Sequence, residues 1–430
     1  MIKLLDKANC CGCEACVQIC PKHCISFEQD DEGFRYPSVN EETCIGCGLC
    51  EKVCPVLNRA HNRTPIESYA AKNPNEEERV KSSSGGIFIL LAKRIIEEGG
   101  VVFGARFDKE WNVVHSYSET LEGLEVFMGS KYVQSRIEKC YIQAKEFLNS
   151  GRKVLFSGTP CQIAGLKLFL RKEYDNLMTI DLICHGVPSP SVWQEYLKEI
   201  KDNAREGENS VSLSPNPSIS ERDTLIPPKD ISIESISFRD KRLGWKKYSF
   251  ALTLAEATAD GKKNTVSLSH MHDNDPYFLG FNDYNLYLRP SCMQCPTRDL
   301  RSGSDITLAD FWGIETLLPE IDDDKGVSVI MANTELGLRA VLSLGLDLHT
   351  VTFDDVLKRN SSICVNSKPF SASARDALKY KGFFNSKRDV FFLNKQMTVI
   401  DRVEDLGKPS FDKLFKSFLR RLYNKLLIKN

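Results

Sequence analysis

Half of the sixteen cysteines in this chain fall into two runs with identical spacing. In each run, three cysteines are separated by two residues, a fourth follows after three more, and a proline comes next. The first run contains Cys10, Cys13, Cys16 and Cys20, and the second contains Cys44, Cys47, Cys50 and Cys54. Three thiolates at this spacing can surround three corners of an iron–sulfur cubane, while a fourth arrives from a distant turn. The runs therefore predict two [4Fe–4S] clusters and a role in electron transfer.

This spacing is that of bacterial two-cluster ferredoxins, in which the fourth cysteine of each run ligates the cluster of the other run. Cluster one is thus predicted to bind Cys10, Cys13, Cys16 and Cys54. Cluster two is predicted to bind Cys44, Cys47, Cys50 and Cys20. Cys11 and Cys24 fall outside the spacing and are predicted to bind neither cluster.

Two other uses of cysteine fit these runs less well. Disulfide frameworks belong to secreted proteins, and the first residues, MIKLLDKAN, have neither the apolar stretch nor the cleavage site of a signal peptide. Zinc would be satisfied by two CxxC pairs and needs no Cys-Pro pair after a three-residue gap. Because thiolates must stay reduced to assemble clusters, we expect a cytoplasmic protein.

The composition is that of an ordinary globular protein. The 430 residues leave room for two or three domains, and 42% of them are hydrophobic and 27% charged. No apolar run is long enough to span a bilayer. A net charge of −1 gives no overall signature of binding to nucleic acid or to an anionic membrane. The expected partners are a redox donor or acceptor protein or a small redox carrier.

The hydrophobic pattern of the sequence changes after the cysteine runs. Residues 1–60 have few long apolar stretches, so clusters must supply much of the folding energy of this ferredoxin-like domain. The polar segment Asn58–Pro65 is typical of a linker. Strands alternate with helices in residues 66–150 and 151–345, which predicts a larger mixed α/β domain with a largely parallel sheet and a β-rich insertion. Residues 346–430 are predicted to form a C-terminal extension. The fold class is therefore a mixture of α+β and α/β.

Apolar periodicity predicts the individual elements of the larger domain. Helices are predicted at Ile87–Glu98, Arg136–Asn149, Gln162–Lys172, Ser191–Lys201 and Glu335–Leu344. Strands are predicted at Val101–Phe107, Val113–Tyr117, Lys153–Phe156, Leu177–Ile183, Ile231–Phe238, Tyr248–Leu254, Asp305–Phe311 and Val327–Ala332. The polar segment Asp202–Lys229 is predicted to be a loop.

A serine–glycine turn, Ser82–Gly86, directly precedes the helix that begins at Ile87. Hydroxyls, free backbone N–H groups and the positive end of the helix dipole make such a turn suitable for phosphate or pyrophosphate. Serine and glycine are also the usual residues at the start of an ordinary helix, so both interpretations stay open.

Four more cysteines of the larger domain occupy positions that can converge. Two follow buried strands and two form a CxxC pair in a loop, and in parallel α/β folds ligands gather at the carboxyl ends of the strands. A third cluster, a structural zinc, or two buried thiols beside a small metal clip would each fit, and the cysteine runs upstream favour the cluster. The four are Cys161, Cys184, Cys292 and Cys295. Cys140 and Cys364 are solitary and are predicted to be core residues.

The order of these motifs along the chain resembles that of one family. After the cysteine runs come the serine–glycine turn, then Gly129–Ser135 (GSKYVQS), GTPCQ, CHGVPS, the CxxC pair and Asp305–Gly313 (DITLADFWG). This order resembles the coenzyme F420 hydrogenase/dehydrogenase beta-subunit family, in its bacterial form with an N-terminal ferredoxin domain. The resemblance covers residues 1–345 and is more specific than any single motif.

The resemblance implies a flavin beside a third [4Fe–4S] cluster in the larger domain. The flavin would be FAD, with FMN as the alternative, and the cluster would bind the four cysteines of that domain. The flavin-binding residues that the resemblance implies are Ser83, Ser84, Gly85, Gly86, Lys131, Tyr132, Gln134 and Ser135. Lys131 would neutralise phosphate charge or lie near the isoalloxazine ring. An ordinary surface loop is the alternative for its segment.

These features together predict an iron–sulfur flavoprotein oxidoreductase. Clusters carry single electrons and a flavin exchanges two as a hydride, so a flavin can join the two chemistries. The hydride acceptor would be a coenzyme F420-like deazaflavin or another small redox carrier. The alternative is a non-catalytic electron-relay subunit of a larger redox complex. No catalytic acid or base is assigned, and His185 beside Cys184 is expected to be structural.

From Phe411 onward the chain is predicted to form a basic amphipathic helix. Lysines and arginines occupy the face opposite its apolar residues, which are Leu414, Phe415, Phe418, Leu419, Leu422, Leu426 and Leu427. Such a helix is compatible with peripheral contact to an anionic membrane surface, or with docking on its own domain or on a partner.

Overall fold

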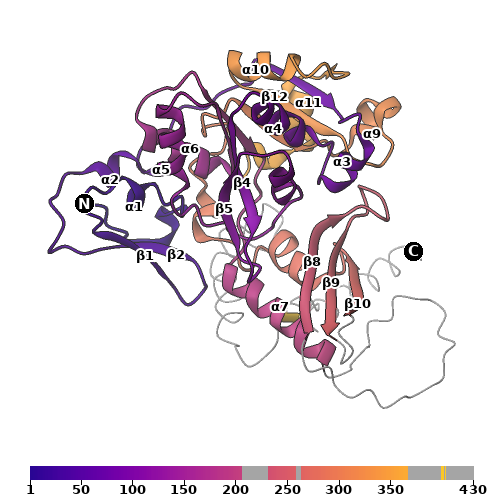
Figure 1. The fold of residues 1–430 in the computed structure, drawn as a ribbon, viewed down its shortest axis with the longest axis horizontal. Coiled ribbons are helices and arrows are strands. Elements are labelled where there is room, and N and C mark those ends of the chain that lie inside the picture. Colours follow the sequence, from indigo (N-terminus) through magenta and orange to yellow (C-terminus); the bar gives the residue numbers. More distant parts are fainter. Residues whose placement is uncertain (206–230, 258–262, 367–398, 401, 403–430) are drawn as a thin grey trace, which may run out of the picture.

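The structure, a computed structural model, describes residues 1–205, 231–257 and 263–366, together with residues 399, 400 and 402. A small N-terminal domain lies beside a larger domain built on a mixed sheet (Figure 1), which confirms the mixed α/β class. The helix predicted from Phe411 and most of the loop predicted at Asp202–Lys229 lie outside the described residues.

The N-terminal domain places a short helix within each cysteine run. Its elements are η1 (Lys7–Asn9), α1 (Ala15–Ile19), β1 (Ile25–Gln29), β2 (Arg35–Val39) and α2 (Leu49–Lys52). The residues just before the two helices, Glu14 and Gly48, have φ of 61° and 70°. This left-handed conformation turns the chain sharply inside each run, and β1 and β2 form an antiparallel hairpin between the runs.

An eight-stranded sheet forms the centre of the larger domain, in the order β13-β3-β12-β11-β7-β6-β4-β5. Its strands are β3 (Glu67–Ala71), β4 (Val101–Phe107), β5 (Val113–Ser118), β6 (Val154–Gly158), β7 (Leu177–Leu182), β11 (Ile306–Asp310), β12 (Ser328–Ala332) and β13 (His349–Thr350). The central strands β4, β6, β7 and β11 are parallel, and the outer strands are antiparallel. The predicted parallel character therefore holds only at the centre. Between β4 and β5 the connection is too short for the crossover that a parallel pair needs.

The helices of the larger domain lie on both faces of this sheet and against the β-rich insertion. They are α3 (Glu76–Lys81), α4 (Ile87–Glu97), η2 (Glu122–Phe127), α5 (Cys140–Asn149), α6 (Pro160–Leu170), α7 (Pro190–Arg205), α8 (Pro276–Phe278), η3 (Leu279–Asp283), η4 (Pro290–Gln294), α9 (Ile314–Leu317), η5 (Pro319–Ile321), α10 (Glu335–Leu342), α11 (Phe353–Arg359) and η6 (Ser361–Ile363). In β6, Val154 and Phe156 pack with α5 and α6, whereas Leu155 between them packs with α4 and α10. Within the part of the chain that the structure describes, none of these helices has both the length and the apolar content of a membrane span.

The predicted β-rich insertion is an antiparallel sheet of β8 (Ile231–Asp240), β9 (Ser249–Ala257) and β10 (Lys263–Met271). Its inner face packs on α7, where the rings of Trp193 and Phe238 have centroids 5.0 Å apart. Strand β10 was not predicted, because its sequence, KNTVSLSHM, has few apolar residues.

The predicted helices agree with the structure to within two residues at each end, except that α5 and α7 each differ by four residues at one end. Helix α5 begins at Cys140 rather than Arg136, because Arg136 extends the sheet edge beside Val114 and Glu138 has a φ of 53° that no α-helix accepts. Helix α7 continues past Lys201 to Arg205, into the segment predicted to be a loop.

The buried carboxylate of Asp305 links the centre of the sheet to α10. It accepts hydrogen bonds from the backbone N of Thr179 (2.8 Å), from the Thr179 hydroxyl (2.6 Å) and from the Thr334 hydroxyl (2.8 Å). We expect Asp305→Asn to lower the unfolding free energy of the larger domain by about 1–3 kcal/mol, because an amide nitrogen would face buried donors. Thermal unfolding followed by near-UV circular dichroism measures the effect. The exposed Asp175→Asn is the matched control, and an equal loss in both variants would contradict the expectation.

Candidate functional site

The two cysteine runs line two hollows in the N-terminal domain. One hollow is lined by the predicted ligands of cluster two, Cys20, Cys44, Cys47 and Cys50. The other is lined by the predicted ligands of cluster one, Cys10, Cys13, Cys16 and Cys54. In each case the fourth cysteine of one run lies with three cysteines of the other, as the crossed pattern requires. All sixteen cysteines lie in described residues and none forms a disulfide. Cys140 is buried, as predicted, whereas the prediction that Cys364 is a core residue is wrong, because its side chain is exposed just after η6.

The thiols of a set act on one another electrostatically. Burial, and then the charges of Cys10 and Cys54, raise the pKa of Cys16. Gathering thiolates therefore costs free energy unless a cationic group compensates them. Among the described residues, no three His, Cys, Asp or Glu side chains converge closely enough to hold a single metal ion. Thiolates around a hollow are the ligands that iron–sulfur clusters take, so both sets fit such clusters.

The hollows differ in their surroundings. Cys47 is exposed, and the neighbouring Ile45 is 61% exposed, so the cluster-two set lies at the protein surface. Cys13 of the other set is buried against α6 of the larger domain. At Gly165 of α6, a Cβ atom would lie 3.0 Å from the Cys13 Sγ. The cluster-one set therefore faces the larger domain.

Three loops bring the four cysteines of the larger domain together. Cys161 opens α6 just after β6, Cys184 follows β7, and Cys292 and Cys295 lie in and just after η4. Burial, and then the charge of Cys292, raise the pKa of Cys184, and Cys161 and Cys295 act on it in the same sense. The four thiols thus gather beside the carboxyl ends of the parallel strands β6 and β7. What they bind stays a prediction.

Cys11 lies between this group and the cluster-one set. Its thiol interacts with those of both Cys13 and Cys161. The sequence predicts no ligand role for Cys11, and the structure places its thiol beside one thiol of each set. The contact that sets Cys11 apart is a tertiary one, so the spacing of cysteines in the sequence could not reveal it. Cys24 likewise lies against a predicted ligand, with its Sγ 3.4 Å from that of Cys20.

An arginine holds the loop that carries Cys184. The guanidinium of the buried Arg298 donates to the carbonyl oxygens of Cys184, His185 and Ser362. The His185 ring nitrogen Nε2 lies 2.6 Å from the Asn285 Oδ1. Both contacts orient backbone and side chains of the loop, which agrees with the structural role expected for His185.

The two segments implied to bind flavin meet at one point. The Ser83 hydroxyl accepts hydrogen bonds from the backbone N (2.6 Å) and the hydroxyl (2.7 Å) of Ser130. The Ser84 hydroxyl donates to the Val327 carbonyl at 2.9 Å. Because Ser130 lies in the segment Gly129–Ser135, this contact joins that segment to the serine–glycine turn.

The glycines of the turn permit close backbone packing. Gly85 is buried, its N–H donates to the Ser328 hydroxyl at 3.0 Å, and a Cβ there would lie 2.7 Å from the Ala71 carbonyl oxygen. Gly86 has a φ of 79° and ends the turn directly before α4. Close packing at Gly85 and the positive φ of Gly86 therefore explain why glycine occupies these positions. Phosphate binding by the two residues stays a prediction.

The rest of the segment leads away from the turn. The Tyr132 ring packs among Phe238, Phe278 and Phe281. Gln134 donates to the Cys11 carbonyl at 3.2 Å. The Ser135 hydroxyl accepts from the Gln162 side chain at 2.9 Å. The eight residues implied to bind flavin thus extend from the serine–glycine turn to the thiols rather than forming one cluster.

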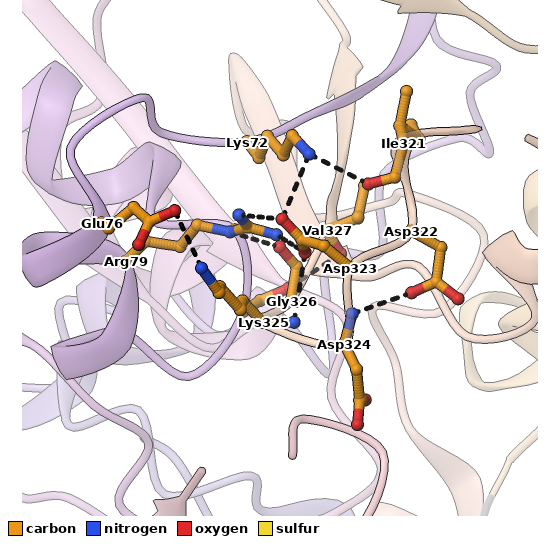
Figure 2. Close-up of polar contacts among 12 residues, drawn as sticks. Lys72, Glu76, Arg79, Ile321, Asp322, Asp323, Asp324, Lys325, Gly326 and Val327 are labelled. Atoms are coloured by element: carbon orange, nitrogen blue, oxygen red, sulfur yellow. Dashed lines mark hydrogen bonds and ion pairs between the residues drawn. The ribbon is translucent and has the colours of Figure 1, made fainter. Parts of the chain in front are cut away.

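Two cations that the sequence did not single out, Lys241 and Arg79, lie beside the turn. The ammonium of Lys241 donates to the Ser84 carbonyl at 2.9 Å, and desolvation lowers its pKa to about 7. Arg79 donates to the Gly326 carbonyl at 2.8 Å and forms an ion pair with Asp323 (Figure 2). Desolvation also lowers the pKa of Lys131 to about 7. A phosphate at this turn would lie near Lys241 and would favour its charged form.

Asp310 connects the DITLADFWG segment to the β-rich insertion. Its carboxylate forms two hydrogen bonds with the buried Arg239 of β8, at 2.8 and 3.2 Å, and accepts another from the Trp245 indole at 3.0 Å. Arg239 also donates to the Tyr132 hydroxyl at 3.2 Å. The segment therefore attaches the insertion to the main sheet next to the predicted flavin residues.

These observations define an iron–sulfur protein with a mixed α/β domain attached to a two-cluster domain. The family described as 4Fe-4S dicluster domain matches residues 9–58, so the N-terminal domain is a [4Fe–4S] domain. A second family, the C terminus of the Coenzyme F420 hydrogenase/dehydrogenase beta subunit, matches residues 151–206, which include Cys161 and Cys184. The two matches cover parts of the chain, and they bear out the predicted resemblance to the coenzyme F420 hydrogenase/dehydrogenase beta-subunit family with an N-terminal ferredoxin domain.

Other comparisons add little to this assignment. No curated protein sequence matches the chain. Among solved structures, a chain of the F420-reducing [NiFe] hydrogenase complex from Methanosarcina barkeri aligns with 80% of this chain and 92% of its own length, at 17% sequence identity and a TM-score of 0.40. At that identity and score, the alignment supports no conclusion about this chain.

His115 of β5 is a buried imidazole near the predicted flavin residues. It is 4% exposed, its Nε2–H donates to the Ser157 carbonyl at 3.1 Å, and its Nδ1 has no hydrogen-bond partner. Burial lowers its pKa to about 4, and the charge of Lys131 adds to this shift.

We expect His115 to stay neutral in the folded protein at every pH above about 5, and to titrate near 6.5 when the chain is unfolded in urea. Between these values only the unfolded chain binds the proton, so the contribution of His115 to stability falls as the pH drops from 6.5 towards 4. Hydrogen–deuterium exchange at the imidazole C2, followed by mass spectrometry across pH, measures both midpoints. A folded midpoint near 6.5 would show that the ring is not desolvated.

Proposed function

We propose that this protein is an iron–sulfur flavoprotein oxidoreductase that passes electrons between its ferredoxin-type clusters and a flavin, and on to a hydride acceptor such as a coenzyme F420-like deazaflavin or another small redox carrier. The observation that carries the proposal is the convergence of Cys161, Cys184, Cys292 and Cys295 beside the cluster-one set. The matches to the two family models support an electron-transfer role for the chain.

In this proposal the twelve cysteines are ligands and take no part as nucleophiles. Cluster one takes Cys10, Cys13, Cys16 and Cys54, and cluster two takes Cys20, Cys44, Cys47 and Cys50. A third cluster takes the four cysteines of the larger domain. The exposed position of Cys47 favours cluster two as the point of exchange with an external redox partner.

The flavin, FAD or FMN, would convert between single-electron and hydride chemistry when bound. Its phosphates are proposed to lie at the serine–glycine turn, where Ser83 and Ser130 present hydroxyls and Lys241 and Lys131 supply positive charge. Lysines held near pKa 7 by desolvation gain from an anionic neighbour, because it would favour their charged form. The segment Gly129–Ser135 is proposed to line the remainder of the site.

The alternative is a non-catalytic electron-relay subunit of a larger redox complex. The same ligand sets serve that function, and the two proposals differ in whether the chain itself holds a flavin and reduces a carrier. In both functions, electrons would pass between the surface and the larger domain through cluster two, then cluster one, then the four cysteines of the larger domain.

Cofactor content separates the two functions. After anaerobic purification we expect about twelve irons and one flavin per chain, since each cubane holds four irons. Iron is measured colorimetrically, and the flavin is identified by chromatography of the heat-released supernatant, which also distinguishes FAD from FMN. About eight irons with no flavin would favour the relay, and zinc at the CxxC pair would exclude the third cluster.

Cys292→Ser tests the third cluster directly. We expect iron to fall from about twelve to about eight per chain while the N-terminal clusters keep their EPR signals, because one of four thiolates is lost. Stopped-flow absorbance should show that the flavin is no longer bleached at the native rate from reduced ferredoxin. Cys364→Ser removes an exposed thiol outside all three sets and should leave iron and bleaching unchanged. Bleaching at the native rate in Cys292→Ser would disprove this relay.

A further inference from the structure

Arg289 is a buried cation at the junction of the two domains. It precedes the CxxC pair in sequence and is 1% exposed. Its Nε donates to the Cys10 carbonyl at 2.7 Å, and its Nη2 donates to the Arg35 carbonyl at 2.9 Å and lies 3.5 Å from the Cys10 Sγ. The guanidinium also lies over the Tyr36 ring, 4.3 Å from its centroid. Arg289 therefore comes from the larger domain and contacts both the loop of the first cysteine run, at Cys10, and strand β2 of the N-terminal domain, at Arg35 and Tyr36.

Both domains determine the position of this guanidinium. The Oε1 of Gln134 accepts from the Arg289 Nη1 at 2.9 Å, while its Nε2 donates to the Cys11 carbonyl at 3.2 Å. Gly12 has a φ of 71°, and a Cβ atom there would lie 2.8 Å from the Arg289 Nη1. The side chain is held in one orientation, with its charge directed at the first cysteine run.

Within the described part of the chain, Arg289 forms no ion pair with an Asp or Glu side chain, so no carboxylate compensates its charge. The groups whose charges act on it most are the thiols of Cys10, Cys11 and Cys292 and the phenol of Tyr36. Because buried charges are screened far less than exposed ones, the guanidinium acts strongly on anything that Cys10 binds.

The cluster-two set has different electrostatic surroundings. The N-terminal ammonium of Met1, which lines that hollow, is paired with Glu51 at 3.2 Å, and Lys22 is exposed. Cys50 accepts a hydrogen bond from the backbone N of Ile2 at 3.3 Å, which carries no full charge. The cations near cluster two are thus compensated or screened by water.

We propose that Arg289 raises the reduction potential of cluster one above that of cluster two, and so draws electrons inward towards the thiols of the larger domain. A reduced cluster carries one more negative charge than an oxidised one, and a buried cation beside a ligand sulfur stabilises it. One electron leaves cluster two, which is oxidised, and enters cluster one, which is reduced, and no bond or proton changes place. The inference rests on the proposed ligand sets and electron path, and it adds a direction to the first step.

Arg289→Gln removes the charge and keeps a hydrogen-bonding side chain. In the full-length protein, a potentiometric titration followed by EPR should show the cluster-one wave at lower potential. At a fixed potential its reduced-to-oxidised ratio should fall about tenfold, which is about 59 mV for one electron. The cluster-two wave should stay in place. Cys47→Ser, which alters a ligand of cluster two, identifies that wave.

Arg35→Gln is the matched control. Arg35 lies at the same junction, but its side chain reaches solvent and is 3.7 Å from the carboxylate of Glu14. We expect this variant to leave every wave in place. If Arg289→Gln moves no wave while keeping its iron, or if Arg35→Gln moves the cluster-one wave as far, the inference is wrong.

Gln134→Glu tests the same charge with Arg289 present, should Arg289→Gln lose its clusters. A carboxylate 2.9 Å from Nη1 would compensate the guanidinium, so the cluster-one wave should again fall. An unmoved wave would overturn the inference. Absence of a third cluster or of flavin from the wild-type protein overturns the proposed function instead, and both N-terminal waves remain measurable in that case.

Discussion

The close packing of the first cysteine run against helix α6 is the constraint on which the rest of this structure depends. Gly165 has no side chain, so the Cys13 thiol can lie directly on the helix, and Cys11 then interacts with both Cys13 and Cys161. A folded interior does not deform gradually, so this contact is either made or lost. Any electron path between the two domains needs it to be made.

The main sheet determines where the four cysteines of the larger domain lie. Because β6 and β7 are adjacent and parallel, the residues that follow them emerge at one edge. Cys161 leaves the first strand through a turn capped by Thr159 and Gln162, and Cys184 leaves the second in a loop held by Arg298. The CxxC pair is brought to the same edge by η4, whose preceding residue is Arg289.

The sequence correctly predicted the features that depend on residues close together in the chain. The crossed cysteine sets follow from spacing, and the limits of α4, β4 and β7 follow from apolar periodicity. Contacts between residues far apart in sequence were not predictable from one chain. Gln134, implied by resemblance to bind flavin, contacts Cys11, and Arg289 contacts Cys10 across 279 positions. A solitary arginine beside a CxxC pair has no pattern of its own, so only the folded structure reveals its role.

The segment Gly129–Ser135 limits how far apart the two halves of the proposed path can lie. At one end Ser130 contacts Ser83 of the serine–glycine turn, and four residues later Gln134 contacts Cys11. Four residues of fully extended chain span at most about 14 Å. A group anchored at that turn would therefore lie near the thiols of both domains. The short segment makes the turn and the cysteine sets parts of one region, whichever carrier finally accepts the electrons.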